Sequence, residues 1–207
     1  MGSFLDLGAA RRFIVNTGRD CLQIQLDFCR QHGIEAFWSM RMNDVHDSYR
    51  HAPALASEKM ARQLFSSYKQ QHPNYLMGAA ADAQEYTIHA TRSMWSALNY
   101  AIPEVRGHVF QLVEEVCQGY DLDGVELDFE RAPIYFTPTL DLQPAEPEQR
   151  ESMTALLRRI RQMTQRTGVA RGRPLLVAVR VPLTRRGCLF LGLDLERWLR
   201  EDLFDLL

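Results

Sequence analysis

Lysine is nearly missing from this chain, which limits the partners that it can be expected to bind. Lys59 and Lys69 are the only lysines among 24 lysines and arginines, so arginine carries almost all of the positive charge. The formal net charge is -2 at pH 7, which leaves no excess of positive charge for a nucleic-acid partner. The arginine bias is typical of a GC-rich bacterial genome, and we draw no function from it.

Long apolar runs are missing too. The chain contains no stretch of about 18 apolar residues, the length needed to span a membrane. Residues 1–20 lack the charged start, apolar run and small-residue cleavage site of a secretory signal. We therefore expect no membrane partner, and a cytoplasmic location if this N-terminus is the natural one.

Paired cysteines and the common cofactor motifs are also absent. Four cysteines are scattered along the chain without a CxxC pair, and we expect buried free thiols rather than disulfides or metal ligands. They are Cys21, Cys29, Cys117 and Cys188. The chain has no HExxH motif, no GxSxG motif and no glycine-rich phosphate loop. No metal or other cofactor is therefore predicted.

What the chain does contain is an alternation of helical and extended patterns. Apolar residues at helical spacing predict helices over residues 20–31, 57–71 (opened by Ser57), 103–119, 147–168 and 193–202. Short apolar segments predict strands within residues 34–42, 124–130 and 175–182, and possible strands at 74–80 and 204–207.

This order predicts an α/β fold with a parallel sheet. Strands that alternate with helices form right-handed βαβ units, in either a doubly wound sheet or a (β/α)8 barrel. A full barrel takes about 250 residues, whereas this chain of 207 residues shows four or five such units. We predict a single domain over residues 1–207, an incomplete (β/α)8 TIM-type barrel.

The segment YDLDGVELDFER, residues 120–131, places carboxylates inside a strand-like pattern. Side chains on a strand alternate between two faces. One face carries Val125, Leu127 and Phe129, and the other carries Glu126, Asp128 and Glu130. In a barrel the carboxylate face would point inward, with its last members at the C-terminal rim where barrel enzymes place their chemistry.

Carboxylates in this arrangement suit the hydrolysis of glycosidic bonds. Neighbours on one face of a strand lie about 6.6 Å apart, and glycosidases use two carboxylates as acid and as nucleophile or base. We predict Asp128, Glu130 and Glu126 as catalytic residues. The alternative is that Glu126 and Asp128 only anchor an internal ion-pair network, and Asp123 either takes part in the chemistry or shapes the turn before the strand.

Other segments supply candidate partners for these carboxylates. Buried carboxylates need compensating partners, and Arg41 and Arg180 fall on the same faces of the flanking strands. The segment RMNDVHD, residues 41–47, follows a strand and falls at the rim, as either a ligand-binding loop or a solvated one. The predicted substrate-binding residues are Arg41, Asn43, Asp44, His46, Arg180 and Tyr135, the last as a stacking platform for a sugar ring.

The carboxylate strand also resembles a known motif. DGVELDFE is similar to the DGxDxDxE strand of glycoside hydrolase family 18, the chitinase-like barrels. Asp123, Gly124, Asp128 and Glu130 match, whereas Glu126 stands where that family has Asp or Asn. The resemblance implies that Glu130 is the general acid and that Asp128 orients an acetamido group that acts as the nucleophile.

The wider chain resembles the glycosyl-hydrolase-like barrels of the family-10-like type over most of residues 20–207. The matching pieces are RMNDVHD, NYAIPEVRGHV, YDLDGVELDFER and LDLERWLREDLFDLL, in that order. In those relatives the position of Glu130 is often not acidic, which makes Asp128 the main catalytic candidate. The resemblance implies a carbohydrate substrate.

Together these features predict a glycoside hydrolase that cleaves an oligo- or polysaccharide. Two alternatives stay open. One is a barrel that binds carbohydrate without cleaving it, with its carboxylates held in salt bridges. The other is a metal-dependent barrel enzyme with Asp128, Glu130 and Asp44 as oxygen ligands.

Overall fold

A computed structural model of the chain describes residues 7–18, 20–47, 65–79 and 94–207. The helices are α1 (Leu7–Thr17), α2 (Cys21–Gln31), α4 (Ser67–Gln71), α5 (Pro103–Gly119), α6 (Pro147–Arg171), α7 (Arg185–Phe190) and α8 (Leu195–Arg200). The strands are β1 (Phe37–Arg41), β2 (Gly124–Asp128) and β3 (Leu176–Arg180), with 3-10 turns η2 (Pro73–Tyr75) and η5 (Thr137–Asp141).

The three strands form a small parallel sheet in the order β1-β2-β3. Leu206, near the C-terminus, adds a parallel bridge to Ala178 on β3. The fold is therefore mixed α/β with parallel strands, as predicted, and residues 204–207 do begin to pair with the sheet. The described part of the chain forms an open sheet rather than a closed barrel.

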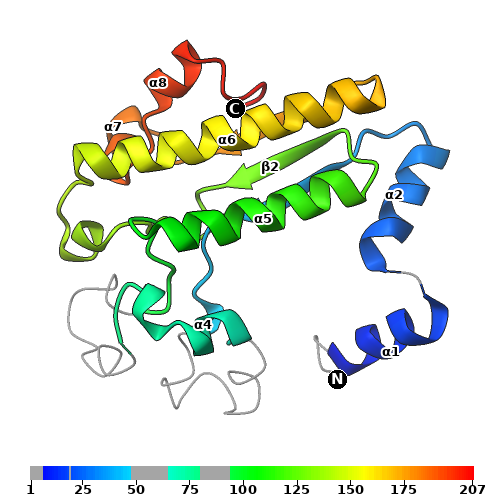
Figure 1. Cartoon of the computed structure of the whole chain (residues 1–207), viewed down its shortest axis with the longest axis horizontal. Coiled ribbons are helices and arrows are strands. Elements are labelled where there is room, and N and C mark those ends of the chain that lie inside the picture. Colours follow the sequence, from blue (N-terminus) through cyan, green and yellow to red (C-terminus); the bar gives the residue numbers. More distant parts are fainter. Residues whose placement is uncertain (1–6, 19, 48–64, 80–93) are drawn as a thin grey trace.

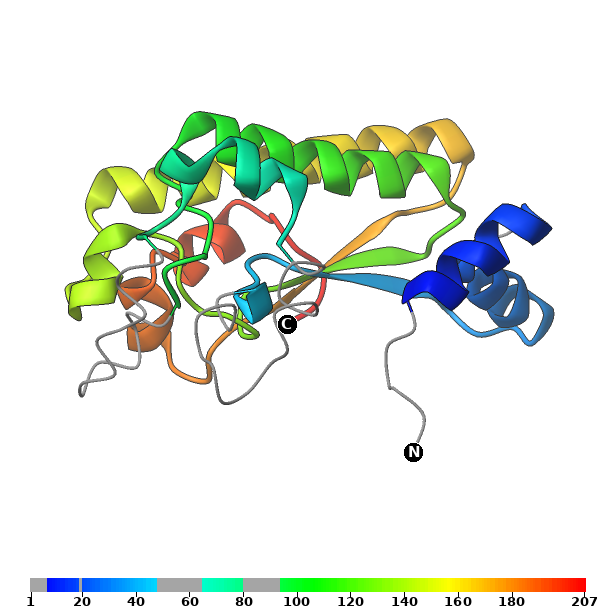
Figure 2. The ribbon, with the colours of Figure 1, turned by 90° about the horizontal axis from the view of Figure 1, so that it is seen from below.

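Helices cover one face of this sheet. Figures 1 and 2 show α5 and α6 side by side along one face, with α2 beyond the end where the strands begin. Val125, Leu127 and Phe129 point into this helix layer and are fully buried. The apolar face of β2 therefore packs as the alternating pattern predicted, and the carboxylate face lies on the opposite side.

Local signals explain where the two long helices begin and end. Pro103 occupies the first turn of α5, where its missing N–H costs nothing, and Glu104 suits the positive end of the helix dipole. Glu146 and Gln149 form a capping box at the start of α6. Gly172 ends α6 with a φ of 72°, a left-handed conformation that favours glycine.

Most of the predicted elements are confirmed, and the differences concern α6, α1, α7 and residues 74–80. Helix α6 runs on to Arg171, and α1 and α7 were not predicted. Residues 74–80 are not a strand as far as they are described, because η2 is followed by a single antiparallel bridge between Leu76 and Leu98. Ser57 and the first part of the helix predicted over 57–71 lie outside the described residues, which show α4 at its end.

The cysteines are free, but they are not all buried. Cys117 and Cys188 are buried, whereas Cys21 is exposed and Cys29 is partly exposed. Burial raises the pKa of the Cys117 thiol to about 12. No helix in the described residues has the length and apolar character needed to cross a membrane.

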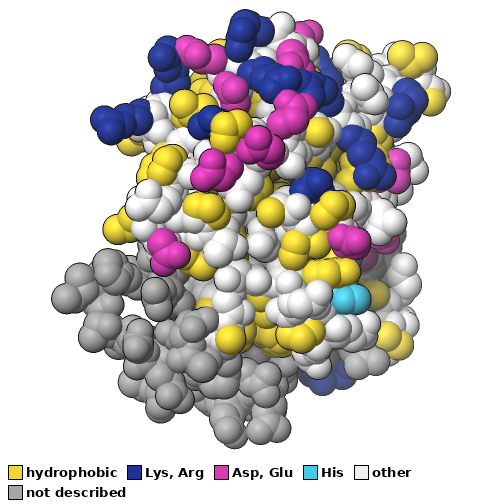
Figure 3. All heavy atoms as spheres, turned by 60° about the vertical axis from the view of Figure 1, so that its left-hand side comes forward, with side chains coloured by type: hydrophobic (Ala, Val, Ile, Leu, Met, Phe, Trp, Pro, Cys, Tyr) yellow, Lys and Arg dark blue, Asp and Glu magenta, His cyan; other side chains and the backbone are white. Residues whose placement is uncertain are grey.

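Ion pairs hold α8 to α6. Arg158 on α6 contacts Glu151 and Glu201, and Arg197 on α8 contacts the same two carboxylates. Basic and acidic side chains are interspersed over the upper part of the face shown in Figure 3. This network gives the charges near α6 and α8 a structural role.

Candidate active site

The carboxyl ends of the three strands bring opposite charges together. Arg41, Asp128 and Arg180 are register partners at the last positions of β1, β2 and β3. Parallel strands share one C-terminal edge, the place where open α/β sheets and barrels bind their ligands. A carboxylate thus stands between two arginine-bearing strands at this edge, which we call the rim.

Asp128 is buried, and its two oxygens have different surroundings. Oδ1 accepts hydrogen bonds from the backbone N–H groups of Glu130 (2.9 Å) and Arg131 (3.1 Å). Oδ2 accepts no hydrogen bond from the described residues, and its ion-pair contact is with Nη1 of Arg180 at 3.8 Å. The carboxylate is therefore held in place by one oxygen, while the other keeps its hydrogen-bonding capacity.

Glu130 shares Arg180 with Asp128. Nε of Arg180 donates to Oε2 of Glu130 at 3.0 Å, and the Glu130 side chain is 42% exposed. One guanidinium thus contacts Asp128 and Glu130, which are two of the three carboxylates that Arg180 was expected to meet. Asp128 is the enclosed member and Glu130 the open one.

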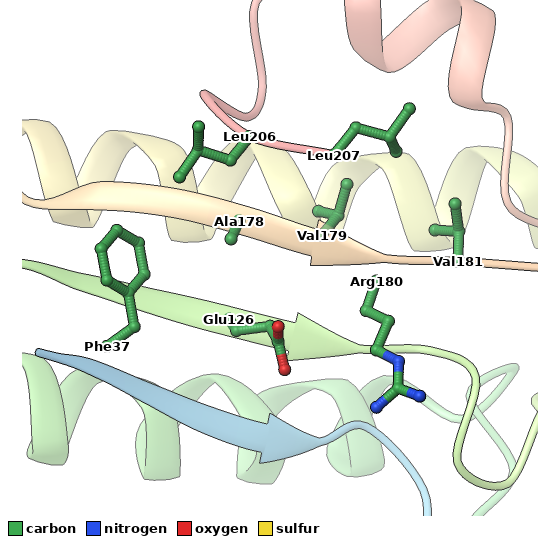
Figure 4. A pocket seen from close by; sticks show the side chains of 8 residues that line it. All are labelled: Phe37, Glu126, Ala178, Val179, Arg180, Val181, Leu206 and Leu207. Carbon is green, nitrogen blue, oxygen red and sulfur yellow. The ribbon is translucent and has the colours of Figure 1, made fainter.

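Glu126 lies deeper on the same face and lines a pocket of about 410 Å³. Figure 4 shows its carboxylate on the same side of the strands as the side chains of Phe37 and Arg180, with Leu206 and Leu207 beside β3. Oε1 of Glu126 accepts a hydrogen bond from Ser39 at 2.6 Å. The pocket thus combines apolar walls with one carboxylate and one guanidinium.

A second polar group follows β1. Arg41 does not pair with the β2 carboxylates as expected, because its ion pair is with Asp44 at 3.0 Å. Asp44 also lies 2.8 Å from Nδ1 of His46, and Nη2 of Arg131 lies 2.8 Å from Nε2 of the same ring. These four residues form a hydrogen-bonded series, Arg41–Asp44–His46–Arg131, which we call the rim series.

The hydrogen bonds of the rim series affect the pKa of Asp44 and determine which nitrogen of His46 carries the proton. Burial alone would raise the pKa of Asp44, but hydrogen bonds from the backbone and ring of His46 and from Arg41 lower it overall. Arginine can only donate, so Nε2 of His46 must accept from Arg131. The imidazole in this arrangement is neutral, with its proton on Nδ1 and directed at Asp44.

Asn43 is a correction to the predicted binding site. Its side chain is buried, and Nδ2 donates to the backbone carbonyls of Leu98 (2.9 Å) and Ile134 (2.7 Å). Oδ1 accepts from the N–H groups of Leu98 (3.0 Å) and Asp44 (3.2 Å). The amide is fully used by the backbone, so Asn43 joins the rim loops to one another rather than offering atoms to a sugar.

Tyr135 is a second correction. It is fully buried, its hydroxyl donates to the carbonyl of Phe129 at 2.8 Å, and its ring packs edge-on against Tyr100. Burial, with contributions from the nearby Tyr100 and Asp128, raises the pKa of Tyr135 well above its ordinary value. A buried ring in this position packs against Tyr100 and Phe129, next to Asp128, and cannot stack on a sugar.

Two features of the rim were missed by sequence reasoning. Arg131 directly follows the carboxylate motif, and its position next to Glu130 was a signal that could have been used. The buried pair of Lys69 and Asp47 (2.7 Å), with Ser96 donating to Asp47 at 2.5 Å, had no local signal because its members come from distant segments. Lys69 also donates to the carbonyl of Asp44 at 2.9 Å and so helps to position the rim series.

The residues predicted for a metal centre do not converge. Glu130 contacts Arg180, Asp44 contacts Arg41 and His46, and Asp128 is bound by backbone N–H groups. Within the described ranges, no three His, Cys, Asp or Glu side chains are grouped as metal ligands would be. The described geometry therefore does not bring Asp128, Glu130 and Asp44 together as the metal-dependent alternative requires.

Comparison with protein families places most of the chain in a known family. The model of the family described as glycosyl hydrolase-like 10 matches residues 14–152, which include β1, β2 and the rim up to Arg131. No curated protein matches the chain.

Proposed function

Since the chain belongs to the glycosyl hydrolase-like 10 family, we propose that it hydrolyses glycosidic bonds in an oligo- or polysaccharide. We further propose that its parallel sheet is one arc of a TIM-type (β/α)8 barrel. The carboxylate face of β2 would then line the barrel interior, and the rim would be the active site.

The observation that carries the proposal is the asymmetric environment of Asp128. Two backbone N–H groups fix one oxygen, so the carboxylate keeps its direction without using its second oxygen. That second oxygen lies on the side of Arg180, at the edge where barrel enzymes bind substrate. A carboxylate with only a structural role would be expected to have both oxygens satisfied.

Hydrolysis of a glycosidic bond needs one group to protonate the leaving oxygen and a second carboxylate to attack or to activate water. Asp128 and Glu130 follow one another on the same face of the chain and share Arg180. We assign these two as the acid–base pair, with Arg180 orienting both. Glu126 and the pocket beside it would contact the sugar deeper in the cleft.

The test is glycan hydrolysis by the full chain, wild type against Asp128→Asn and Glu130→Gln. Each substitution keeps the shape of the side chain and removes its charge. We expect turnover to fall at least about 100-fold in Asp128→Asn, the size typical of losing an acid–base or electrostatic group. Asp27→Asn, an exposed substitution on α2 at the other end of the sheet, should leave turnover unchanged.

The glycan panel should contain N-acetylated and plain glycans with α and β linkages. Turnover that depends on the acetamido group would favour a mechanism in which the substrate supplies the nucleophile. Equal turnover in wild type and both rim variants would contradict the assignment of the carboxylates.

A second candidate function is carbohydrate binding without cleavage. Arg180 contacts both Asp128 and Glu130, which is the salt-bridged arrangement expected of a rim that only binds. In that case glycans would bind to the wild type with no turnover on any member of the panel. Binding without turnover would thus select this function over hydrolysis.

A further inference from the structure

Arg131 differs from the other two arginines of the rim in its ion pairing. Arg180 contacts Glu130 and Asp128, and Arg41 contacts Asp44. Arg131 is exposed, and among the described residues its side chain makes no ion pair. Its side-chain hydrogen bond goes to an uncharged acceptor, Nε2 of His46.

This guanidinium is nevertheless held in place. Asp44 orients the His46 ring through Nδ1, and the ring in turn accepts the hydrogen bond from Arg131. At the other end of the residue, the Arg131 backbone N–H donates to Oδ1 of Asp128. Both the backbone and the side chain of Arg131 are therefore tied to the site, which is unusual for a solvated surface arginine.

A guanidinium has five N–H groups in a planar fork, and only one hydrogen bond here uses that fork. The remaining donors suit a planar or tetrahedral anion, which arginine binds in a bidentate manner. The acidic side chains of the rim do not occupy them, because Asp44 faces Arg41 and His46 while Glu130 faces Arg180.

We propose that Arg131 binds an anionic substituent of the glycan, either a sugar carboxylate or a sulfate ester. The inference rests on the proposed function and names the substrate class of the same rim. Arg41 is half exposed at the other end of the rim series and extends the positive charge along it. The glycan's acidic group would lie over Arg131, one residue beyond Glu130.

The experiment is calorimetric binding of matched glycan pairs to the full chain. Oligogalacturonate and its methyl ester differ in the carboxylate charge, which the ester methyl group removes, and a sulfated galactan oligosaccharide without uronic acid and its neutral desulfated form differ only in the sulfate. We expect wild type to bind the acidic member of at least one pair at least about ten-fold more tightly. The pair that shows this preference identifies the source of the anion.

Substitutions then assign the preference to Arg131. Arg131→Gln should remove most of the preference and leave the neutral glycan's Kd unchanged, whereas Arg131→Lys should keep part of it because a point charge remains. Arg166→Gln, an exposed arginine on α6, is the matched control and should behave as wild type.

The outcomes separate this inference from the proposed function. A wild type that binds both members of each pair equally, or an Arg131→Gln variant that keeps the full preference, overturns the role of Arg131. Loss of turnover in Asp128→Asn would still support hydrolysis in that case. A chain that binds none of these glycans also overturns the role of Arg131, while turnover on the separate glycan panel decides the proposed hydrolysis.

Discussion

Asp128 and Asn43 are both buried polar residues at the same edge of the sheet, but they differ in free hydrogen-bonding capacity. Asp128 keeps one oxygen without a hydrogen bond from the described residues, whereas the Asn43 amide is used in full by backbone groups of three other residues. Buried polar groups that are fully paired stabilise the fold, and those with spare capacity can act on a ligand. The free oxygen makes Asp128 a candidate to act on a ligand, whereas the fully paired amide gives Asn43 a structural role.

It follows that Asn43→Ala should reduce stability more than binding. The substitution leaves the buried carbonyl of Ile134 and the partly buried carbonyl and N–H of Leu98 without their partner. We expect the free energy of unfolding to fall by about 2–4 kcal/mol, measured by urea denaturation. Asn74→Ala, at an exposed position in η2, is the control and should change it by less than about 0.5 kcal/mol.

The test is completed by measuring the Kd of Asn43→Ala for a glycan at a temperature where the variant is folded, and this Kd should be close to that of the wild type. An Asn43→Ala variant of normal stability with strongly weakened glycan binding would show that the amide contacts sugar after all.

At the residue scale, the sequence predicted which strand faces carry charge but not which atoms are free. Alternation along β2 placed Glu126, Asp128 and Glu130 correctly opposite the buried apolar residues, because a strand has only two faces. Tyr135 was wrongly predicted as a platform, since a loop has no such periodicity and its path depends on distant residues. Here the ring of Tyr135 meets Tyr100, which is 35 positions away in the chain.

At the scale of elements, helix boundaries followed local chemistry closely. Helix α5 begins at Pro103 and ends at Gly119, as predicted from the proline and the glycine. Helix α7 was not predicted, because its six residues are too few to show an apolar period. Short elements of this kind form when their neighbours supply the packing surface.

A buried hydrogen bond between α6 and α8 should contribute to the stability of the fold. Nε1 of Trp198 on α8 donates to Oγ1 of Thr154 on α6 at 3.0 Å, and both residues are fully buried. Thr154→Val preserves the volume but leaves the indole N–H without an acceptor. We expect the free energy of unfolding to fall by about 1–3 kcal/mol, measured by chemical denaturation followed through tryptophan fluorescence.

Thr164→Val is the matched control for this contact. Thr164 is equally buried in α6, but its hydroxyl donates only to the carbonyl of Arg161 within the same helix. Thr164→Val should lower the free energy of unfolding clearly less than Thr154→Val does. Equal losses in the two variants would mean that the hydrogen bond between the helices contributes little.

On the scale of the whole molecule, the two ends of the sheet use charge differently. The rim leaves parts of its charged groups unpaired, whereas at the opposite end, where the strands begin, Asp121 and Asp123 both pair with Arg30 and Arg173. There Asp123 accepts from the N–H of Ala36 (2.7 Å) and contacts both Arg30 (3.0 Å) and Arg173 (2.5 Å). This arrangement resolves the role of Asp123 in favour of structure, since it joins α2 to the start of all three strands.

The sheet also shows why the overall architecture was only partly predictable. The order of helices and strands was enough to predict parallel βα units, because the connection rules leave few alternatives. Closure into a barrel depends on strands pairing across the whole sheet, which no local pattern encodes. The described residues accordingly confirm the units and leave the closed barrel as part of our proposal.

The ion-pair cluster around Asp123 predicts how the stability of the whole molecule depends on pH. Burial alone would raise the pKa of Asp123, but hydrogen bonds from Ala36, Arg30 and Arg173 lower it overall. The folded-state pKa is thus below the unfolded value of about 3.9. Its contribution to stability is present above that value and is lost as the pH falls through the lower, folded-state pKa.

We therefore expect Asp123→Asn to lower the free energy of unfolding by about 1–3 kcal/mol at pH 7, because charge-assisted hydrogen bonds to two arginines are weakened. The deficit should be constant between about pH 7 and pH 5 and should shrink below about pH 4, where the wild type loses the same contribution. Urea denaturation across this pH range measures it, with Asp27→Asn on the exposed side of α2 as the control. A deficit that stays constant down to pH 3 would show that Asp123 acts through its shape and neutral hydrogen bonds, and that charge is not what joins the strands at this end of the sheet.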